Sequence, residues 1–278
     1  LAAKADVDAW DSIGRKKEYI KYREAWKRVC EEPDYVPHMP LDVTIDACSR
    51  CNLRCLGCEQ SFSTNIPGLG MANSNRLYKI LDQCIDFEIP CVSFTHRGEP
   101  TLNKHLVEYV DWAMRNGILE TRIVTNALSP HAGILVDLAK AKISRIVISI
   151  DGFSKESYES YRLGSDYQLM LSNVHELLDY KTDNNLLFPR IRIQCVRNKF
   201  NEHEIASFIK YWGSVPGVDD VRISDITNRA SGKIDEHKFY CGNQKSLGRA
   251  PCPQPRQRIV FTNAAAKASP CCHNWHGS

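Results

Sequence analysis

The sequence predicts an α/β protein built on a parallel sheet, and two observations support this. Six short apolar segments of strand length alternate with segments of helix length across residues 41–228. Strands that alternate with helices pair in parallel through right-handed crossovers, as in a barrel or an open doubly wound sheet. The alternation stops near residue 229, so residues 229–278 are expected to form a separate, smaller module.

The composition excludes several classes of protein. The chain has 278 residues, of which 43% are hydrophobic and 25% charged, as expected for a globular protein that can bury a core without disulfides. The net charge of +3 and the lack of a basic run argue against a nucleic-acid partner. No segment approaches the ~18 apolar residues of a membrane span, and the first residues lack a signal-peptide core. We therefore expect a cytoplasmic protein with no membrane partner, and the composition leaves the oligomeric state open.

Residues 1–40 are expected to form a helical preface to the sheet. Trp10, Tyr19 and Trp26 recur among many charged side chains over residues 8–32, which is the pattern of an amphipathic helix. We expect this helix to pack on the outside of the main fold.

The other predicted elements follow the apolar periodicity. Strands are expected over 41–46, 91–96, 121–125, 145–150, 190–196 and 220–225, with a further short strand over 258–262. Helices are expected over 75–87, 103–116, 130–141 and 202–212, with more helix between the fourth and fifth strands up to about residue 181. Ser74 is the expected cap of the first of these helices.

Polar side chains follow the carboxyl ends of the predicted strands, namely His96, Asn126, Ser149, Gln194 and Asp225. In parallel α/β folds this edge of the sheet carries the active site. His96, Asp225 and Cys195 are therefore candidate catalytic residues. The alternative is a structural role, which for Cys195 would be packing in the core.

The chain has twelve cysteines, most of them around residues 48–58 and 241–272. Secreted disulfide proteins are usually short and loop-rich, so metal binding in a reducing compartment is the better interpretation for this long chain. Cys30, Cys84 and Cys91 lie in apolar contexts and are expected to be buried core thiols.

Three cysteines, Cys51, Cys55 and Cys58, lie within eight residues directly after the first strand. Three thiolates can hold three corners of a four-iron cluster and leave the fourth iron open to a ligand. The alternative is a structural zinc site, which needs a fourth ligand close by. Cys48 could supply that ligand.

This Cys-xxx-Cys-xx-Cys spacing resembles the cluster motif of the radical S-adenosylmethionine (SAM) enzymes. Gly98-Glu99-Pro100 resembles the family's GGE-type motif, and Ser149-Ile150-Asp151-Gly152 resembles its SxDG element. Arg162 lies in a segment similar to one whose arginine pairs with the SAM carboxylate. The resemblance covers about residues 41–228 and implies a partial (βα)6 TIM-like barrel.

The resemblance also implies cofactors and roles. A [4Fe-4S] cluster would reduce SAM, which breaks into methionine and a 5′-deoxyadenosyl radical that removes hydrogen from a substrate. A reductant such as flavodoxin or ferredoxin would supply the electron. The Gly98-Glu99-Pro100 motif would bind the amino group of SAM. Ser149 or Asp151 would bind the ribose, and Arg162 would bind the carboxylate. Asn126 and Gln194 are further expected SAM contacts.

Two positions depart from the family's pattern. Gly57 stands where relatives often carry an aromatic residue that packs on adenine, so adenine contacts are expected elsewhere. Arg97 stands where relatives carry a small residue. It is expected either to meet an anion of the substrate or to point to solvent.

A second resemblance lies in the C-terminal module. Thirteen residues separate Cys252 from Ala266, and four residues separate Ala266 from Cys271. This spacing is similar to the start of a SPASM/Twitch extension, whose cysteines hold auxiliary iron–sulfur clusters. Ala266 departs from the glycine of that motif. The resemblance implies an auxiliary cluster on Cys252 and Cys271, with Cys272 and Cys241 as further candidates. The resemblance implies that the module is incomplete in this chain, because relatives complete the site with later cysteines.

The expected function is therefore that of a radical SAM oxidoreductase. An auxiliary cluster often takes an electron from the substrate radical in relatives, which favours oxidation of a carbohydrate or aminocyclitol-like small molecule. Modification of a peptide or protein side chain is an alternative, although only a helix and a turn precede the first strand. A non-enzymatic iron–sulfur or zinc scaffold is a further alternative.

Overall fold

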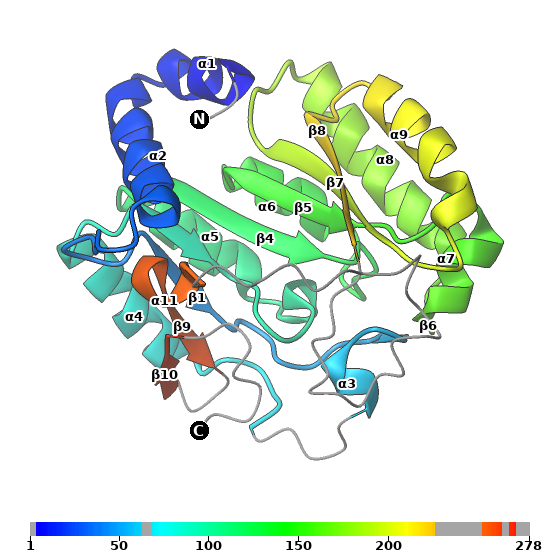
Figure 1. The fold of residues 1–278 in the computed structure, drawn as a ribbon, viewed down its shortest axis with the longest axis horizontal. Coiled ribbons are helices and arrows are strands. Elements are labelled where there is room, and N and C mark those ends of the chain that lie inside the picture. The colour runs from blue at the N-terminus through cyan, green and yellow to red at the C-terminus, as the bar shows by residue number, and fades with distance from the viewer. Residues whose placement is uncertain (1–3, 63–67, 226–251, 263–266, 271–278) are drawn as a thin grey trace.

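The computed structural model describes residues 4–62, 68–225, 252–262 and 267–270 (Figure 1). Its main sheet has eight strands in the order β10-β9-β1-β3-β4-β5-β7-β8. Only the β10–β9 pair is antiparallel. The strands are β1 Asp42–Ile45, β3 Cys91–Ser93, β4 Glu120–Thr125, β5 Arg145–Ser149, β7 Arg190–Arg197, β8 Asp220–Asp225, β9 Arg258–Thr262 and β10 Lys267–Ser269. A separate antiparallel pair joins β2 Arg54–Cys55 to β6 Arg162–Leu163.

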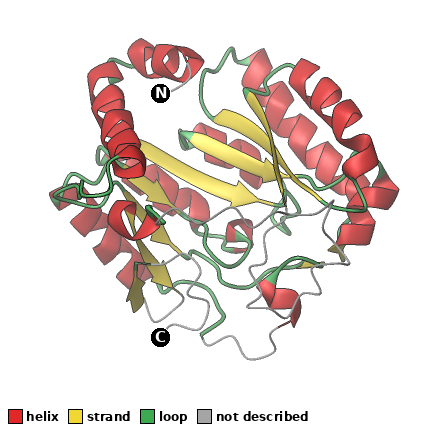
Figure 2. Ribbon diagram, in the orientation of Figure 1, coloured by secondary structure: helices red, strands yellow, loops and turns green. Residues whose placement is uncertain are grey.

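Helices cover one face of the sheet, as Figure 2 shows. The helices of the described residues are α1 Lys4–Ser12, α2 Lys16–Glu31, α3 Glu59–Phe62, α4 Ser74–Asp86, α5 Leu106–Arg115, α6 Ile134–Lys140, α7 Lys155–Tyr161, α8 Tyr167–Asp183, α9 Ile205–Ser214 and α11 Gln254–Gln257, with 3-10 turns η1 Pro100–Leu102 and η2 Glu202–Glu204. Asn73, rather than Ser74, caps α4 by accepting a hydrogen bond from the Arg76 amide. Within the described ranges, no helix combines the length and apolarity needed to cross a bilayer.

The six predicted barrel strands are confirmed, and β3 is shorter than predicted. Beyond Ser93 the Thr95 side chain takes over the pairing with β4, because its hydroxyl donates to the Val124 carbonyl and accepts from the Val124 amide. The chain can therefore turn away here without leaving the edge of β4 unpaired.

Alternate residues of each strand face opposite ways, which separates the core from the barrel interior. Ile146 and Ile148 of β5 join the main hydrophobic cluster with the helices, as do Ile191 and Ile193 of β7. The residues between them face inward, and many are polar. This inward face is where a parallel barrel holds its ligands.

The N-terminal preface is two helices rather than the single helix predicted over 8–32. Gly14, at a φ of 74°, lies between α1 and α2, and glycine adopts this left-handed conformation without strain. The helices pack on the main fold as expected, with Trp10 stacked on Tyr19 at 4.1 Å between ring centroids. Asp6 pairs with Arg145 and Arg190 near the amino ends of β5 and β7, which fixes α1 there.

The predicted strand at 258–262 is confirmed, and it lies in the main sheet. β9 runs parallel to β1 along four residue pairs, and β10 folds back on it. Next to it, the Arg256 guanidinium donates to carbonyl oxygens at the end of α2, including those of Val29 and Glu32. The described part of the C-terminal region is therefore an extension of the sheet.

Candidate functional site

The cysteine loop follows β1 and lies beyond the carboxyl ends of the strands (Figure 1). Cys51, Cys55 and Cys58 are half-buried. Burial raises the pKa of the Cys51 thiol to about 12, and the neighbouring thiols of Cys55 and Cys58 act in the same direction. The three thiols belong to one loop of eight residues, and a cation bound there would favour loss of their protons.

Two sets of contacts hold this loop in place. Cys55 pairs with Arg162 in the β2–β6 ladder, and the Leu56 amide donates to the Tyr161 carbonyl at 3.0 Å. On the other side of the loop, the side-chain Nδ2 of Asn126 lies 2.9 Å from the Asn52 side-chain oxygen and 3.9 Å from the Cys51 sulfur. Asn126, predicted as a cofactor contact, thus positions the loop in this structure.

Cys48 does not join the three loop thiols. Its side chain is buried, and its thiol donates to the Arg50 carbonyl at 3.5 Å. Among the described residues, no three His, Cys, Asp or Glu side chains are arranged to hold a single metal ion. Three half-buried thiols with the fourth turned into the protein fit the three-thiolate set of a cluster that keeps one iron open.

The Gly98-Glu99 segment packs directly on the cysteine loop. The Glu99 amide donates to the Arg50 carbonyl at 2.8 Å, and a Cβ atom on Gly98 would overlap the carbonyl oxygens of Cys48 and Arg50. Glycine is therefore required here by the close approach of two backbones.

The Glu99 carboxylate is already occupied by the protein. It accepts hydrogen bonds from the Thr101 amide and hydroxyl, the Thr125 hydroxyl and the Asn126 amide, at 2.7–3.1 Å. Burial raises the pKa of Glu99, while these donors oppose the shift. The expected contact of this motif with an amino group therefore falls mainly to its backbone.

Asp151 and Arg162 form a buried ion pair. Asp151 Oδ2 lies 2.7 Å from Arg162 Nη2 and 2.9 Å from Nε, and its other oxygen accepts from the Val196 amide at 2.7 Å. The two residues were expected to bind different parts of SAM, whereas here they bind each other. Ser149 remains half-buried at the end of β5.

Ser149, Gln194 and Arg222 form a row across the inward face of the sheet. Ser149 pairs with Gln194 in the β5–β7 register, and Gln194 pairs with Arg222 in the β7–β8 register. Val221 and Ile223, on either side of Arg222, pack against the core, so Arg222 faces the barrel interior. We call these three residues the inward row.

The candidate catalytic residues occupy different settings. Cys195 is fully buried in the main core and accepts a hydrogen bond from Asn201, so it packs in the core and does not face the lumen. Asp225 is exposed and pairs with Arg197 at 2.5 Å. His96 is half-buried in the loop after β3. Of the two interpretations of Cys195, the structure agrees with packing in the core, because Cys195 shares the strand face of Ile191 and Ile193.

Arg97 and Cys30 also differ from expectation. Arg97 is buried beside Asp46 at 3.0 Å and meets neither solvent nor an open anion site. Cys30 is exposed, whereas Cys84 and Cys91 are buried as predicted. Of the C-terminal candidates, Cys252 is described and exposed, and Cys241, Cys271 and Cys272 lie outside the described residues.

The radical SAM superfamily profile matches residues 47–207, which is more than half of the chain and includes the cysteine loop, Glu99, Asp151 and Arg162. This chain belongs to the radical SAM superfamily. The family implies a [4Fe-4S] cluster and SAM, and the three half-buried thiols of the loop fit such a cluster.

Curated relatives match this radical SAM protein along part of their length. A GTP 3′,8-cyclase of Thermodesulfovibrio yellowstonii is 25% identical over 173 residues, 59% of this chain and 50% of that protein. GTP 3′,8-cyclase 2 of Pseudomonas aeruginosa is 22% identical over 204 residues, 73% of this chain and 57% of that protein. The chain thus spans about half the length of the curated relatives it matches.

Solved structures share the fold of this radical SAM protein. Streptococcus suis SuiB bound to the precursor peptide SuiA superposes with a TM-score of 0.66 at 15% identity, over 94% of this chain and 65% of that chain. BtrN in complex with AdoMet and 2-DOIA superposes with a TM-score of 0.52 at 15% identity, over 85% and 75%. At this identity the likeness concerns the fold.

Two residues of the site escaped the sequence analysis. Asn52 lies inside the cysteine motif and donates to the Leu128 carbonyl at 2.6 Å. Gln60 follows the motif and donates to the carbonyls of Ser49 and Arg97, at 2.8 and 2.5 Å. Both tie the loop to other elements. In the sequence, the only sign of this role was that both amide side chains lie in or next to the cysteine motif.

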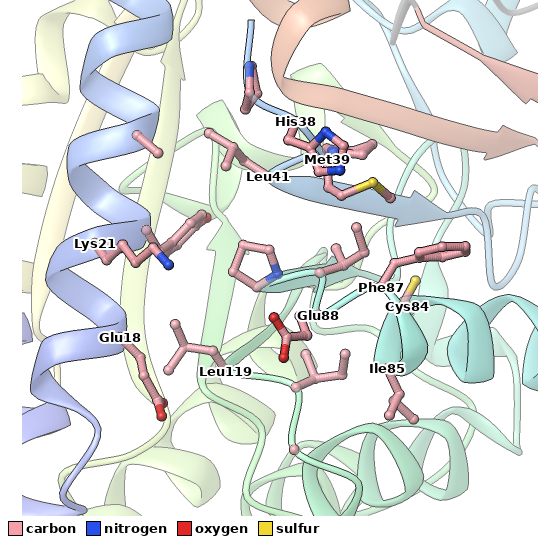
Figure 3. Close-up of a pocket in the computed structure, with 18 of the residues that line it drawn as sticks. Glu18, Lys21, His38, Met39, Leu41, Cys84, Ile85, Phe87, Glu88 and Leu119 are labelled. Atoms are coloured by element: carbon pink, nitrogen blue, oxygen red, sulfur yellow. The ribbon is translucent and has the colours of Figure 1, made fainter.

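A cavity of about 660 Å³ lies at the opposite end of the sheet (Figure 3). Glu18 and Lys21 of α2 line one side, while Phe87 and Glu88 after α4 line the other. Leu41 and Leu119, just before β1 and β4, also line it. It therefore adjoins the amino ends of the strands, whereas the cysteine loop adjoins their carboxyl ends.

Proposed function

We propose that this radical SAM enzyme binds SAM over the cysteine loop and oxidises a hydroxylated small molecule of the carbohydrate or aminocyclitol type. The observation that carries the proposal is the gathering of Cys51, Cys55 and Cys58 against the Gly98-Glu99 segment and Arg162 at the carboxyl edge of the sheet. When bound, the cluster supplies one electron to SAM, which yields methionine and a 5′-deoxyadenosyl radical.

The chain's own residues would orient SAM. The half-buried backbone of Gly98 would offer its carbonyl oxygen as a hydrogen-bond acceptor to the amino group. Arg162 faces the carboxylate, with Asp151 holding the guanidinium in place. Ser149, at the end of β5, offers its hydroxyl to the ribose. Gln194 of β7 lies opposite Ser149 in the β5–β7 pair, and its side-chain amide can also hydrogen-bond the ribose.

Polar groups on the inward face support a hydroxylated substrate. Hydroxyl and amide side chains of the inward row can hydrogen-bond several hydroxyl groups at once. Loss of a hydrogen atom from a carbinol carbon, followed by loss of one proton and one electron, gives a carbonyl. Cys252, Cys271 and further C-terminal cysteines would hold an auxiliary cluster, and such a cluster would supply an acceptor for that electron.

A second candidate is a reaction on a nucleotide. The curated relatives are GTP 3′,8-cyclases, and Arg222 offers an exposed guanidinium on the inward face that could pair with a phosphate. The fold shared with SuiB, which was solved with a precursor peptide, keeps a peptide substrate as the remaining alternative.

The substrate proposal is tested by product analysis on the anaerobically reconstituted chain with SAM and dithionite. Separate reactions contain a set of sugars and aminocyclitols, GTP, or peptides. The proposal predicts that a sugar or aminocyclitol stimulates 5′-deoxyadenosine formation and loses two hydrogen atoms by mass spectrometry. Turnover of GTP or a peptide alone would overturn it.

Replacing Arg222 separates the first two candidates. Arg222→Ala should leave a neutral sugar substrate turned over at a similar KM, but should raise the KM for GTP at least tenfold if a phosphate binds there. Gln194→Ala is the matched variant in the same row. Because Gln194 is also assigned to SAM, its replacement should raise the KM for SAM as well as the KM for a hydroxylated substrate.

A further inference from the structure

Two hydrogen-bond donors face the sulfur of Cys51. The Leu53 backbone amide donates to this sulfur at 3.4 Å, and the side-chain Nδ2 of Asn126 donates to it at 3.9 Å. Both bonds are long because sulfur is a large, soft and weak acceptor. Leu53 belongs to the cysteine loop itself, whereas Asn126 follows β4 and reaches the sulfur from another strand end. The Asn126 contact therefore depends on the tertiary fold.

The orientation of the Asn126 side chain is fixed by its other partners. Its Oδ1 accepts a hydrogen bond from the Leu128 amide at 2.8 Å, so its Nδ2 must point the other way, toward the cysteine loop. One Nδ2 hydrogen serves the Asn52 oxygen at 2.9 Å, which leaves the second hydrogen for Cys51. Asn52 in turn donates to the Leu128 carbonyl, which closes a ring of contacts. Asn126 is 4% exposed, so bulk water has little access to the donor.

A donor at this sulfur acts on the charge of a cluster that the sulfur ligates. One-electron reduction of a cluster adds one negative charge, part of which lies on the ligating thiolates. An N–H group that faces such a thiolate binds it more strongly in the reduced state than in the oxidised state. Hydrogen bonds to the sulfurs are accordingly among the features that set the reduction potential of iron–sulfur clusters.

A negative charge lies on the other side of Asn126. Its backbone amide donates to the buried Glu99 carboxylate at 2.7 Å. Burial is the largest cause of the raised pKa of the Cys51 thiol, and the Glu99 charge acts in the same direction. A carboxylate that disfavours a thiolate also disfavours the extra electron of a reduced cluster. The side-chain donor of Asn126 opposes this effect at the sulfur itself.

We propose that the Asn126 side-chain amide donates a hydrogen bond to the Cys51 thiolate and thereby raises the reduction potential of the cluster. This inference rests on the proposed function, because it takes Cys51 as a cluster ligand. It makes Asn126 a positioning residue that acts through Cys51, in addition to its role in holding the loop.

The test compares wild type, Asn126→Leu and Asn52→Leu after anaerobic reconstitution of the full chain, without SAM. Iron and sulfide content are measured first. The reduced cluster is then followed by electron paramagnetic resonance during a redox titration with dithionite. Asn126→Leu should lower the equilibrium constant for one-electron reduction about three- to tenfold, as expected for one lost hydrogen bond. This change corresponds to a fall in midpoint potential of about 30–60 mV.

Asn52→Leu is the matched control. It removes the same contact between Asn52 and Asn126, together with the bond to the Leu128 carbonyl, but it leaves the donor at Cys51 in place. The Asn52 oxygen also lies 3.9 Å from the Cys51 sulfur. Removal of an acceptor from this position should not lower the potential. We therefore expect the midpoint of Asn52→Leu to equal or exceed that of wild type.

A second measurement keeps the proposal testable if Asn126→Leu holds no cluster. Wild type and Asn52→Leu are prepared with asparagine labelled with ¹⁵N at the side-chain amide. Electron spin-echo spectroscopy of the reduced cluster should then show coupling to ¹⁵N in both proteins, because Asn126 is present in both. The side-chain nitrogen of Asn52 is bonded to the Leu128 carbonyl and is not required for this coupling.

Three outcomes would overturn the inference. The first is an equal midpoint potential in wild type and Asn126→Leu. The second is an equal fall in both variants, which would assign the effect to the packing of the loop. The third is a reduced wild-type cluster without ¹⁵N coupling. A cluster that shows the expected shift and coupling but cleaves no SAM would instead refute the proposed function alone.

Discussion

Glu99 joins the loop after β3 to the end of β4 through one buried carboxylate. Four donors from Thr101, Thr125 and Asn126 reach its oxygens, and they oppose the rise in its pKa that burial causes. Asn126 in turn contacts Asn52 and the Cys51 sulfur. The Glu99 carboxylate therefore helps to position the cysteine loop through Asn126, which directly follows β4.

Replacing Thr125 with valine tests this support. The change keeps the shape but removes the 2.7 Å hydrogen bond to Glu99 and the acceptor for the Ala127 amide. We expect the free energy of unfolding in urea to fall by about 2 kcal/mol, the cost of a lost bond to a charged group. Thr182→Val, on α8, is the control and should cost under about 0.5 kcal/mol. Equal losses for both variants would contradict the role of Glu99.

At the scale of elements, the site depends on two loops that meet backbone to backbone. The loop after β1 and the loop after β3 approach so closely that Gly98 has no room for a side chain. Gln60 of α3 bridges the same two loops through the carbonyls of Ser49 and Arg97. The cysteine loop thus takes its shape from the neighbouring strand connection as well as from its own sequence.

Gly98→Ala should disturb the cysteine loop. The new methyl group would overlap the Cys48 and Arg50 carbonyls, so the loops must separate. We expect the reconstituted variant to hold less than half the iron of wild type. Gly70→Ala is the control, because a Cβ there meets nothing within 4 Å. Full iron content in Gly98→Ala would show that the close approach is unnecessary.

At the scale of the whole molecule, α2 and the segment formed by α11 and β9 come together beside β1, although they are far apart in the sequence. β9 pairs with β1, and Arg256 donates to four carbonyl oxygens at the end of α2 and just after it. The N-terminal helices in turn pack near the amino ends of the strands through Trp10 and Tyr22. The end of the barrel opposite the cysteines is therefore covered by the N-terminal helices.

Arg256→Ala should loosen this junction. Loss of its bonds to the carbonyls should lower the free energy of unfolding by about 1–2 kcal/mol. Cleavage by a protease near α11 should become faster. Arg115→Ala removes an exposed ion pair with Asp111 and should change stability by less than about 0.5 kcal/mol. Indistinguishable behaviour of the two variants would argue against the junction.

Local patterns predicted the strands well because buried parallel strands are continuous apolar runs. The same periodicity could have placed Cys195 in the core, since it shares the parity of Ile191 and Ile193. Contacts between distant segments could not be read in this way. The ion pair of Asp151 with Arg162 depends on how α7 meets the strand ends, which no local pattern specifies.

The central claim is that Cys51, Cys55 and Cys58 hold the cluster that cleaves SAM. It is tested most directly by measuring 5′-deoxyadenosine after anaerobic reconstitution of the full chain and addition of SAM and dithionite. The wild type should form 5′-deoxyadenosine, and Cys55→Ala should form none, whereas Cys195→Ala should retain the product. An intact wild-type cluster without 5′-deoxyadenosine, or continued formation by Cys55→Ala, would contradict the account.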